Sequence, residues 1–198
     1  MTDGDRLRVL ADEAATCRAC DLWRNATQTV FGEGSADARV VLVGEQPGDE
    51  EDLAGRPFVG PAGRLLDKAL AKAGLDRGGV YVTNAVKHFK WSPRGKRRIH
   101  ERPNRTEVVA CHRWLEEELA VLDEDAVVVV LGATAGQALF GSKFRVGAAR
   151  GETLSLDTHP VVATIHPSAV LRARTPEDRE RSYADLVTDL RRAAGLAA

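Results

Sequence analysis

Four stretches of the chain are almost continuously apolar and rich in β-branched residues. Such runs are typical of strands that are buried on both faces of a parallel sheet, because a half-buried strand would alternate apolar and polar positions. The four predicted strands are Ala38–Gly44, Val80–Val86, Ala126–Gly132 and Pro160–Ile165. The pattern therefore predicts a central, four-stranded, mainly parallel sheet.

Helical patterns lie between and after these strands, with apolar residues three and four positions apart and with proline or glycine near the ends. The predicted helices are Pro61–Ala73, Thr106–Leu122, Ala133–Phe140 and Pro176–Ala194. Alternation of strands and helices indicates an α/β fold, here a three-layer α/β/α sandwich. We expect residues 1–198 to form one domain, since this length can bury a substantial core.

Ligands of open α/β sheets bind beyond the carboxyl ends of the strands. This rule directs attention to the loops after Gly44, Val86, Gly132 and Ile165. Three of these four loops hold the unusual residues of the sequence. The sheet edge that they share is therefore the predicted site.

Composition adds little to this picture, since 43% of the 198 residues are hydrophobic and 29% are charged. No apolar run approaches the ~20 residues of a membrane span, and the N-terminus lacks the apolar core of a signal peptide. We therefore expect a cytoplasmic protein and, by default, a monomer. The three cysteines, Cys17, Cys20 and Cys111, argue against a disulfide framework, because their number is odd.

The formal net charge is only −1, so overall charge does not indicate a nucleic-acid partner. The segment from Lys87 to Arg105 is nevertheless strongly basic, with Glu101 as its only acid. A run of this kind is usually a solvated loop, although a local patch can attract phosphates within about a Debye length, ~8 Å. The position of this basic segment in the chain decides whether it is a solvated loop or a patch that binds phosphates.

The first predicted strand runs into Gly44-Glu45-Gln46-Pro47-Gly48-Asp49, and a second segment rich in glycine and proline follows at Gly55–Gly63. These residues fix a tight backbone close to a ligand. Neither the G-x-G-x-x-G nor the G-x-x-x-x-G-K-[ST] motif is present, which excludes a dinucleotide fingerprint and a P-loop. The fourth strand leads into His166-Pro167-Ser168, and a single histidine there is by itself more often structural than catalytic.

Taken together, these motifs resemble the uracil-DNA glycosylase superfamily. The resemblance rests on G-E-x-P-G at Gly44–Gly48, on Asn84 at the second strand and on H-P-S at His166–Ser168. Cys17-x-x-Cys20, the segment Phe58–Gly63 and the later Cys111 resemble the iron–sulfur, family 4 branch. The match extends in order over nearly the whole chain.

This resemblance implies an enzyme that flips uracil out of DNA and cleaves its glycosidic bond. Phe58 would stack on the extruded base and Asn84 would read its amide edge, although alone they fit core packing and a strand-end turn. Glu45 would stabilise positive charge on the sugar, and His166 would hydrogen-bond uracil O2 as negative charge develops. Further predicted substrate contacts are Gln46 and Asp49 on the sugar side, Ser168, and Arg172 at a phosphate, where a surface salt bridge is the alternative.

The same resemblance implies a 4Fe-4S cluster, but the chain departs from the four-cysteine pattern. Where the family places a cysteine in a V-K-C context, this sequence has Val86-Lys87-His88. His88 is therefore the predicted fourth ligand beside Cys17, Cys20 and Cys111, because imidazole can replace a thiolate at one iron. Zinc held by three cysteines and a histidine is the open alternative. We expect the metal group to be structural.

The run Lys96-Arg97-Arg98-Ile99-His100 lies in a predicted loop between the His88 and Cys111 ligands. It resembles the UdgX branch of the superfamily, in which the loop histidine bonds covalently to the abasic sugar. A neutral imidazole is a good nucleophile near pH 7, and the sugar cation left by uracil is a strong electrophile. The resemblance thus implies that His100 traps the enzyme on DNA after one turnover, while Lys96, Arg97 and Arg98 contact the DNA.

Two alternatives stay open at the level of sequence. A conventional glycosylase would release uracil and the abasic DNA repeatedly, with His100 only one more DNA-contacting residue of a basic loop. A non-catalytic iron–sulfur protein that binds DNA or senses redox state would also account for the cysteines and the basic run. It would leave unexplained why Glu45, Asn84 and His166 all fall at strand ends.

Overall fold

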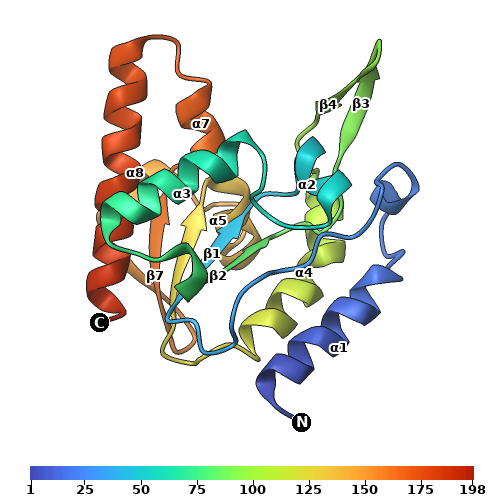
Figure 1. Cartoon of the computed structure of the whole chain (residues 1–198), viewed down its shortest axis with the longest axis horizontal. Helices are drawn as coiled ribbons and strands as arrows, with labels where there is room; N and C mark the ends of the chain where they lie inside the picture. The colour runs from blue at the N-terminus through green and yellow to red at the C-terminus, as the bar shows by residue number, and fades with distance from the viewer.

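Five strands form the central sheet of the computed structural model, which describes residues 1–198 (Figure 1). The strands are β1 (Val40–Gly44), β2 (Val80–Asn84), β5 (Val127–Leu131), β6 (Thr153–Leu156) and β7 (His159–Thr164), in the order β2-β1-β5-β7-β6. Strands β2, β1, β5 and β7 pair in parallel with their neighbours, and β6 pairs antiparallel with β7 at one edge of the sheet. All four predicted strands are present.

The predicted number of four strands is wrong, because the edge strand β6 is added to them. Its residues alternate between exposed and half-buried, whereas β1, β2 and β5 are buried along their whole length. A short, largely solvated edge strand lacks the continuous apolar run that identifies a buried one. The signal that located the other four strands was therefore absent at Thr153–Leu156.

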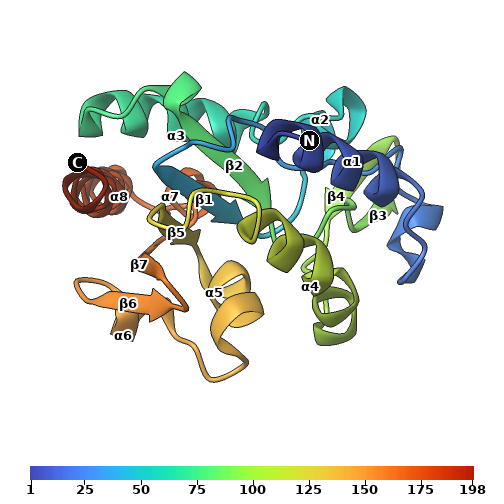
Figure 2. The same cartoon turned by 90° about the horizontal axis from the view of Figure 1, so that it is seen from below.

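Helices cover both faces of the sheet, as the predicted three-layer sandwich requires (Figure 2). One face packs against α1 (Asp3–Ala15), α4 (Arg105–Leu119), α5 (Ala133–Phe140) and α6 (Val146–Ala149), and the other against α3 (Pro61–Ala73), α7 (Pro167–Leu171) and α8 (Pro176–Leu196). The short helix α2 (Asp49–Ala54) and two 3₁₀ turns, η1 (Asp21–Arg24) and η2 (Arg77–Gly79), complete the elements.

Local signals explain where the helices begin and end. Helices α3 and α5 have the predicted bounds, and Gly74 closes α3 with a positive φ of 84°, which glycine adopts without strain. Helix α4 begins after the capping box of Asn104 and Glu107. None of the helices combines the length and the hydropathy that a membrane-spanning helix requires.

The basic segment between β2 and α4 forms a β-hairpin, where the sequence analysis predicts a loop. Strands β3 (Trp91–Arg94) and β4 (Arg97–His100) pair antiparallel, and Trp91 lies opposite His100. Gly95 takes a positive φ of 62° in the turn that joins them. The hairpin rises beyond the carboxyl end of the sheet (Figure 1). Because the two strands pair only with each other, their polar residues show no apolar pattern from which a strand could be predicted.

Candidate active site

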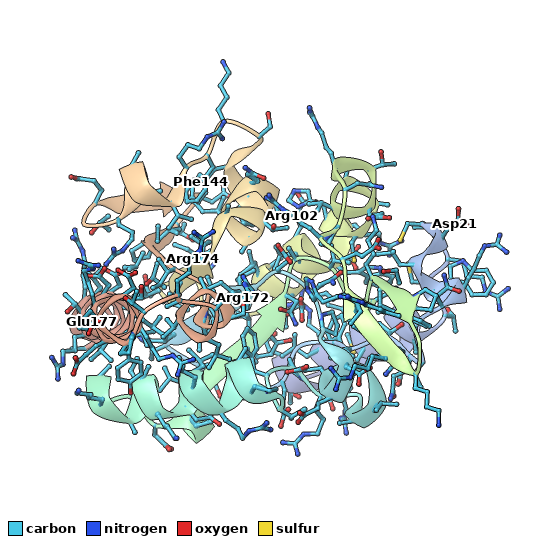
Figure 3. All side chains as sticks on the ribbon, turned by 90° about the horizontal axis from the view of Figure 1, so that it is seen from above. Asp21, Arg102, Phe144, Arg172, Arg174 and Glu177 are labelled. Carbon is cyan, nitrogen blue, oxygen red and sulfur yellow. The ribbon has the colours of Figure 1, made fainter.

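Four parallel strands end at one edge of the sheet, and each delivers a polar side chain there. Glu45 follows β1, Asn84 ends β2, Thr134 lies in the first turn of α5 after β5, and His166 follows β7. Figure 3 looks down on this side of the molecule, where Arg102 and Arg172 also lie. The predicted location of the site is therefore the place where these residues gather.

The floor of the site is built around Gly44, which pairs with Asn84 in the sheet. A Cβ on Gly44 would collide with Oδ1 of Asn84 and lie 2.6 Å from Cζ of Phe58, so only glycine lets these two side chains approach. Asn84 is 3% exposed as a residue, and no hydrogen bond joins its side-chain amide to the protein, although the amide atoms are not fully enclosed. An amide in this position is available to hydrogen-bond a ligand.

Phe58 is held in an unusual backbone conformation beside Asn84. Its φ is +56°, a left-handed value that is strained for an aromatic residue. Gly63 makes this possible, because a Cβ there would collide with the backbone of Phe58. The Phe58 ring lies 6.1 Å from the His166 ring at an interplanar angle of 30°. The structure thus brings Phe58, Asn84 and His166 to the same floor.

His166 has a neutral imidazole ring, and one of its two ring nitrogens is a defined hydrogen-bond donor. Its Nδ1 accepts a hydrogen bond from the backbone N–H of Ser168 at 3.2 Å, and the Ser168 hydroxyl lies 2.8 Å from the same nitrogen. Burial, aided by the positive charge of Arg172, lowers the pKa of His166 to about 4. Because Nδ1 is an acceptor, the single proton of the neutral ring is on Nε2, which can donate to a ligand.

Glu45 carries the negative charge of the site. Its Oε2 accepts a short hydrogen bond from the Thr134 hydroxyl and lies 3.9 Å from Nε of Arg102. Its Oε1 lies 3.5 Å from Nε2 of His100 at the end of the hairpin. Sequence reasoning missed Thr134 and Arg102. The rule on strand ends pointed to the loop that contains Thr134, but threonine there is too common to single out.

His100 is half-exposed and its pKa is lowered. Partial burial disfavours the imidazolium, and the nearby Arg172 does so as well, whereas Glu45 acts in the opposite direction. A ring that stays neutral keeps a nitrogen lone pair available as a nucleophile. Strand pairing with Trp91 fixes His100 beside Glu45, and the centroids of the His100 and Phe89 rings lie 6.0 Å apart.

Gln46 has partners other than the predicted sugar. Its Nε2 donates to the carbonyl oxygens of Lys90 and Glu101, at 3.2 and 3.0 Å, and its Oε1 accepts from the backbone N–H of Lys90 at 3.1 Å. These two residues lie at the two ends of the hairpin. Because both ends of its amide are engaged, Gln46 supports the base of the hairpin, and its contact with substrate stays a prediction.

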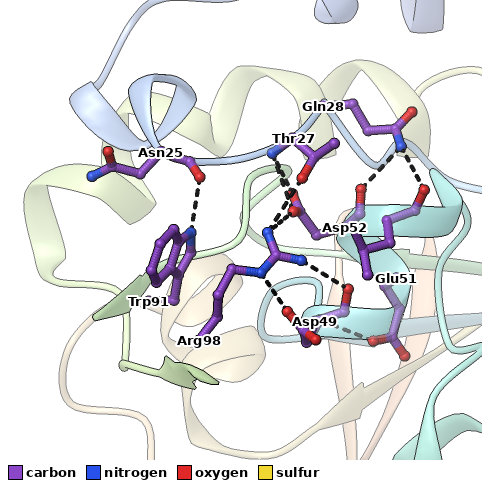
Figure 4. A network of polar contacts seen from close by, with 10 residues as sticks. Asn25, Thr27, Gln28, Asp49, Glu51, Asp52, Trp91 and Arg98 are labelled. Atoms are coloured by element: carbon purple, nitrogen blue, oxygen red, sulfur yellow. Dashed lines mark hydrogen bonds and ion pairs between the residues drawn. The ribbon is translucent and has the colours of Figure 1, made fainter. Parts of the chain in front are cut away.

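Arg98 and Asp49 also differ from their predicted roles, because they pair with each other (Figure 4). The guanidinium of Arg98 donates to Oδ1 of Asp49 and to Oδ2 of the fully buried Asp52, both at 2.5 Å. It also lies over the rings of Phe89 and Trp91, at 5.4 and 5.6 Å. Arg98 and Asp49 thus form an internal clamp on the hairpin, and their contacts to DNA and to the sugar stay predictions.

The N-terminal segment after Cys20 closes this clamp (Figure 4). Nε1 of Trp91 donates to the carbonyl oxygen of Asn25 at 2.8 Å, and Arg98 donates to the Thr27 hydroxyl at 3.2 Å. The backbone N–H of Thr27 in turn donates to the Asp52 carboxylate at 3.0 Å. The hairpin is thus tied to α2 on one side and to the cysteine-bearing segment on the other.

The Arg98→Gln variant is expected to lose about 2–3 kcal/mol of unfolding free energy, because Asp52 would keep a buried carboxylate without its cation. Because the Arg98 side chain is partly exposed, this loss of unfolding free energy is smaller than for an ion pair in which both side chains are buried. Urea denaturation measures it, with Arg97→Gln as the matched control, since Arg97 is the exposed neighbour and has no ion pair. Equal stability of the two variants would contradict the clamp.

The other predicted cations are free of internal partners. Lys96 and Arg97 are exposed near the tip of the hairpin, as contacts to DNA would require. Arg172 caps the end of α7 and makes no ion pair, although it lies close enough to lower the pKa of both His100 and His166. An unpaired arginine beside two neutral histidines is well suited to bind an anion.

The three cysteines gather in one small apolar cluster with Trp114. Nε1 of Trp114 donates to Sγ of Cys17, and the backbone N–H of Lys87 donates to Sγ of Cys111, both at 3.2 Å. Burial raises the pKa of the Cys111 thiol to about 11 and also raises that of Cys20. One buried and two half-buried thiols, two of which accept from N–H donors, suit a metal group that is held by thiolates.

His88 lies on the other side of this region and lines a cavity of about 240 Å³ together with Cys17. Its Nε2 is 3.0 Å from the Thr29 hydroxyl, and burial lowers its pKa, which favours the neutral ring that a metal needs. No three His, Cys, Asp or Glu side chains converge on one point. Three thiols and an imidazole are a donor set that suits either an iron–sulfur cluster or a zinc ion.

A buried polar network under the site was not predicted. Nζ of Lys87, 1% exposed, pairs with Glu118 and donates to the Asn84 carbonyl at 2.9 Å. Glu118 also accepts from the Tyr81 and Thr83 hydroxyls. Lys87 and Glu118 are 31 positions apart, so no local pattern relates them. This pair holds the end of β2, where Asn84 lies, against α4, where Cys111 lies.

Comparison with known proteins supplies an independent finding. Residues 31–191 match the family model described as the uracil DNA glycosylase superfamily. The chain is 38% identical over 187 residues to the type-4 uracil-DNA glycosylase of Thermotoga maritima, a match that covers 93% of each chain. It is also 38% identical over 180 residues to that of Archaeoglobus fulgidus (86% of each chain) and 33% identical over 176 residues to that of Saccharolobus solfataricus (84% of this chain and 78% of the relative).

Proposed function

Because this chain belongs to the uracil DNA glycosylase superfamily, we propose that it excises uracil from DNA and that His100 then bonds to C1′ of the abasic sugar. The observation that carries the covalent step is the 3.5 Å approach of His100 Nε2 to Glu45 Oε1. It puts a neutral imidazole beside the carboxylate that faces the sugar in this reading. The resemblance of Lys96–His100 to the UdgX loop supports the same step.

Recognition of the base falls to the floor of the site. Phe58 offers an aromatic face to the flipped-out uracil, and the free amide of Asn84 pairs with its amide edge. Nε2–H of His166 donates to uracil O2, where negative charge grows as the glycosidic bond lengthens. Ser168 acts indirectly: its backbone N–H donates to Nδ1 of His166, which leaves the ring proton on Nε2.

Cleavage and trapping follow from the charges around the sugar. The electron pair of the glycosidic bond leaves with uracil, and the Glu45 carboxylate stabilises the positive charge on the sugar. The unprotonated ring nitrogen of His100 gives its lone pair to C1′, and the proton on its other nitrogen passes to solvent. The resulting N-glycosidic bond has no easy leaving group, so the protein stays attached after one turnover. Arg172, Lys96 and Arg97 would hold DNA phosphates.

The covalent product is tested directly on a denaturing gel. Mixing the protein with a uracil-containing single strand, followed by heat and detergent, is expected to leave a stable protein–DNA band whose amount equals the amount of protein. Free abasic DNA in excess over protein would instead support the conventional, multiple-turnover glycosylase. Uracil that remains in the DNA would contradict both.

We also propose that Cys17, Cys20, His88 and Cys111 hold a 4Fe-4S cluster, which would tie the N-terminal segment to the loop after β2. The purified protein is expected to contain iron and to absorb broadly in the visible range. His88→Cys should keep the iron, since it restores a fourth thiolate, whereas His88→Ala should lose much of it. Zinc in place of iron, or full iron content in His88→Ala, would contradict this ligand set.

A further inference from the structure

A groove of about 490 Å³ opens beside the candidate active site, between the first turns of α4 and one side of α5. Its volume lies within the ~300–1,000 Å³ of small-molecule sites. Pro103, Val109 and Ala138 give it an apolar lining, and Arg102 and Arg105 add positive charge. No carboxylate lines it. An apolar surface with cations at its border is suited to a nucleobase joined to phosphates.

Arg102 connects this groove with the catalytic residues. Its Nε donates to the Thr134 hydroxyl at 3.2 Å and lies 3.9 Å from the Glu45 carboxylate, and its Nη2 donates to Gln137 Oε1 at 3.2 Å. Thr134 and Gln137 themselves line the groove. Arg102 thus lies between Glu45 and the groove, so a strand with its uridine beside Glu45 can reach the groove past Arg102.

The exposed apolar surface at this place has no partner within the chain. Val109 is 64% exposed on α4, the most exposed large hydrophobic residue after Met1. It lines the groove together with Ala138, and Gln137 and Ser142 are also among the lining residues. The combination offers van der Waals contact to a ring and hydrogen-bonding groups at its edge, without a requirement for one particular base.

We propose that this groove binds the base of a nucleotide next to the excised uridine, on the side of the strand that passes Arg102. The inference rests on the proposed function, since the uridine has to occupy the site beside Glu45. It assigns α4 and α5 a part in holding the substrate that is separate from the hairpin. The occupant is a segment of the substrate strand itself, with its phosphates facing Arg102 and Arg105.

The test measures uracil release with the protein in excess over short single strands. One series of strands carries no, one or two nucleotides on the 5′ side of the uridine, and a second series carries them on the 3′ side. One added nucleotide on one side is expected to lower the half-saturating protein concentration about tenfold, a typical effect of one bound base. Replacing that nucleotide by a base-free sugar phosphate should remove the gain.

Val109→Glu is expected to abolish the gain and to leave the strand without that nucleotide unaffected, since a carboxylate in the groove repels the flanking phosphate. Val9→Glu, the same change at an exposed position of α1, should behave like the wild type. A gain on neither side, a gain that survives loss of the base, or a gain that survives Val109→Glu would overturn the proposal. Failure to release uracil from any strand would instead contradict the proposed function.

Discussion

His100→Ser is expected to release uracil from DNA without staying attached to it. In the proposed mechanism the departure of uracil depends on Glu45, Asn84 and His166, none of which this substitution changes. The sugar cation is then captured by water, which can enter the space left by the imidazole beside Glu45. The product changes from a covalent adduct to free abasic DNA, and each protein molecule can act more than once.

Denaturing gels and the amount of uracil released per protein molecule measure this change together. The adduct band should fall by more than 100-fold, while uracil release in a single turnover stays within about tenfold of the wild type. Ile99→Ser changes the neighbouring, partly exposed side chain of the same strand and should crosslink normally. A persistent adduct in His100→Ser would show that another residue is the nucleophile.

Glu45→Gln is expected to slow uracil release by about 10²–10³-fold. The neutral amide keeps the size of the side chain and its contact with Thr134, but it no longer opposes the positive charge that develops on the sugar. Because that charge is present in the transition state and not in bound DNA, affinity for uracil-containing DNA should change little. Adduct formation should fall in parallel, since no sugar cation forms to be captured.

Single-turnover rates and equilibrium DNA binding separate these two effects. Glu124→Gln removes a carboxylate from an exposed position away from the site and should match the wild type in both. An unchanged rate in Glu45→Gln would count against catalysis at this edge of the sheet. It would favour the alternative of a protein that binds DNA without cleaving it.

The sequence was sufficient to predict the layers of the fold. Four runs of buried apolar residues identify the parallel strands, and Pro61 and Gly74 bound a helix between them. These signals are local, because burial on both faces demands an unbroken apolar run and helix ends have their own residue preferences. Strand β6 escaped prediction since an edge strand exposes one side to water and needs no such run.

The sequence also predicted which residues of the candidate site gather, because the residues after parallel strands must meet at one edge of the sheet. Glu45, Asn84 and His166 come together there as predicted from their positions at strand ends. Their proposed roles in catalysis are supported by the resemblance to the family, and the experiments above would test them. The free amide of Asn84 and the donor on Nε2 of His166 add the physical reasons why those roles suit them.

Only the tertiary structure decided which polar residues face the substrate and which support the hairpin. Gln46, Asp49 and Arg98 look like binding residues in the sequence, yet each is engaged within the protein. The run that resembled a basic surface loop is a clamped β-hairpin with His100 at its end, beside Glu45, 55 positions away in the chain. Charge and spacing are local properties, whereas the partner of a side chain is set by which distant segments the fold brings into contact.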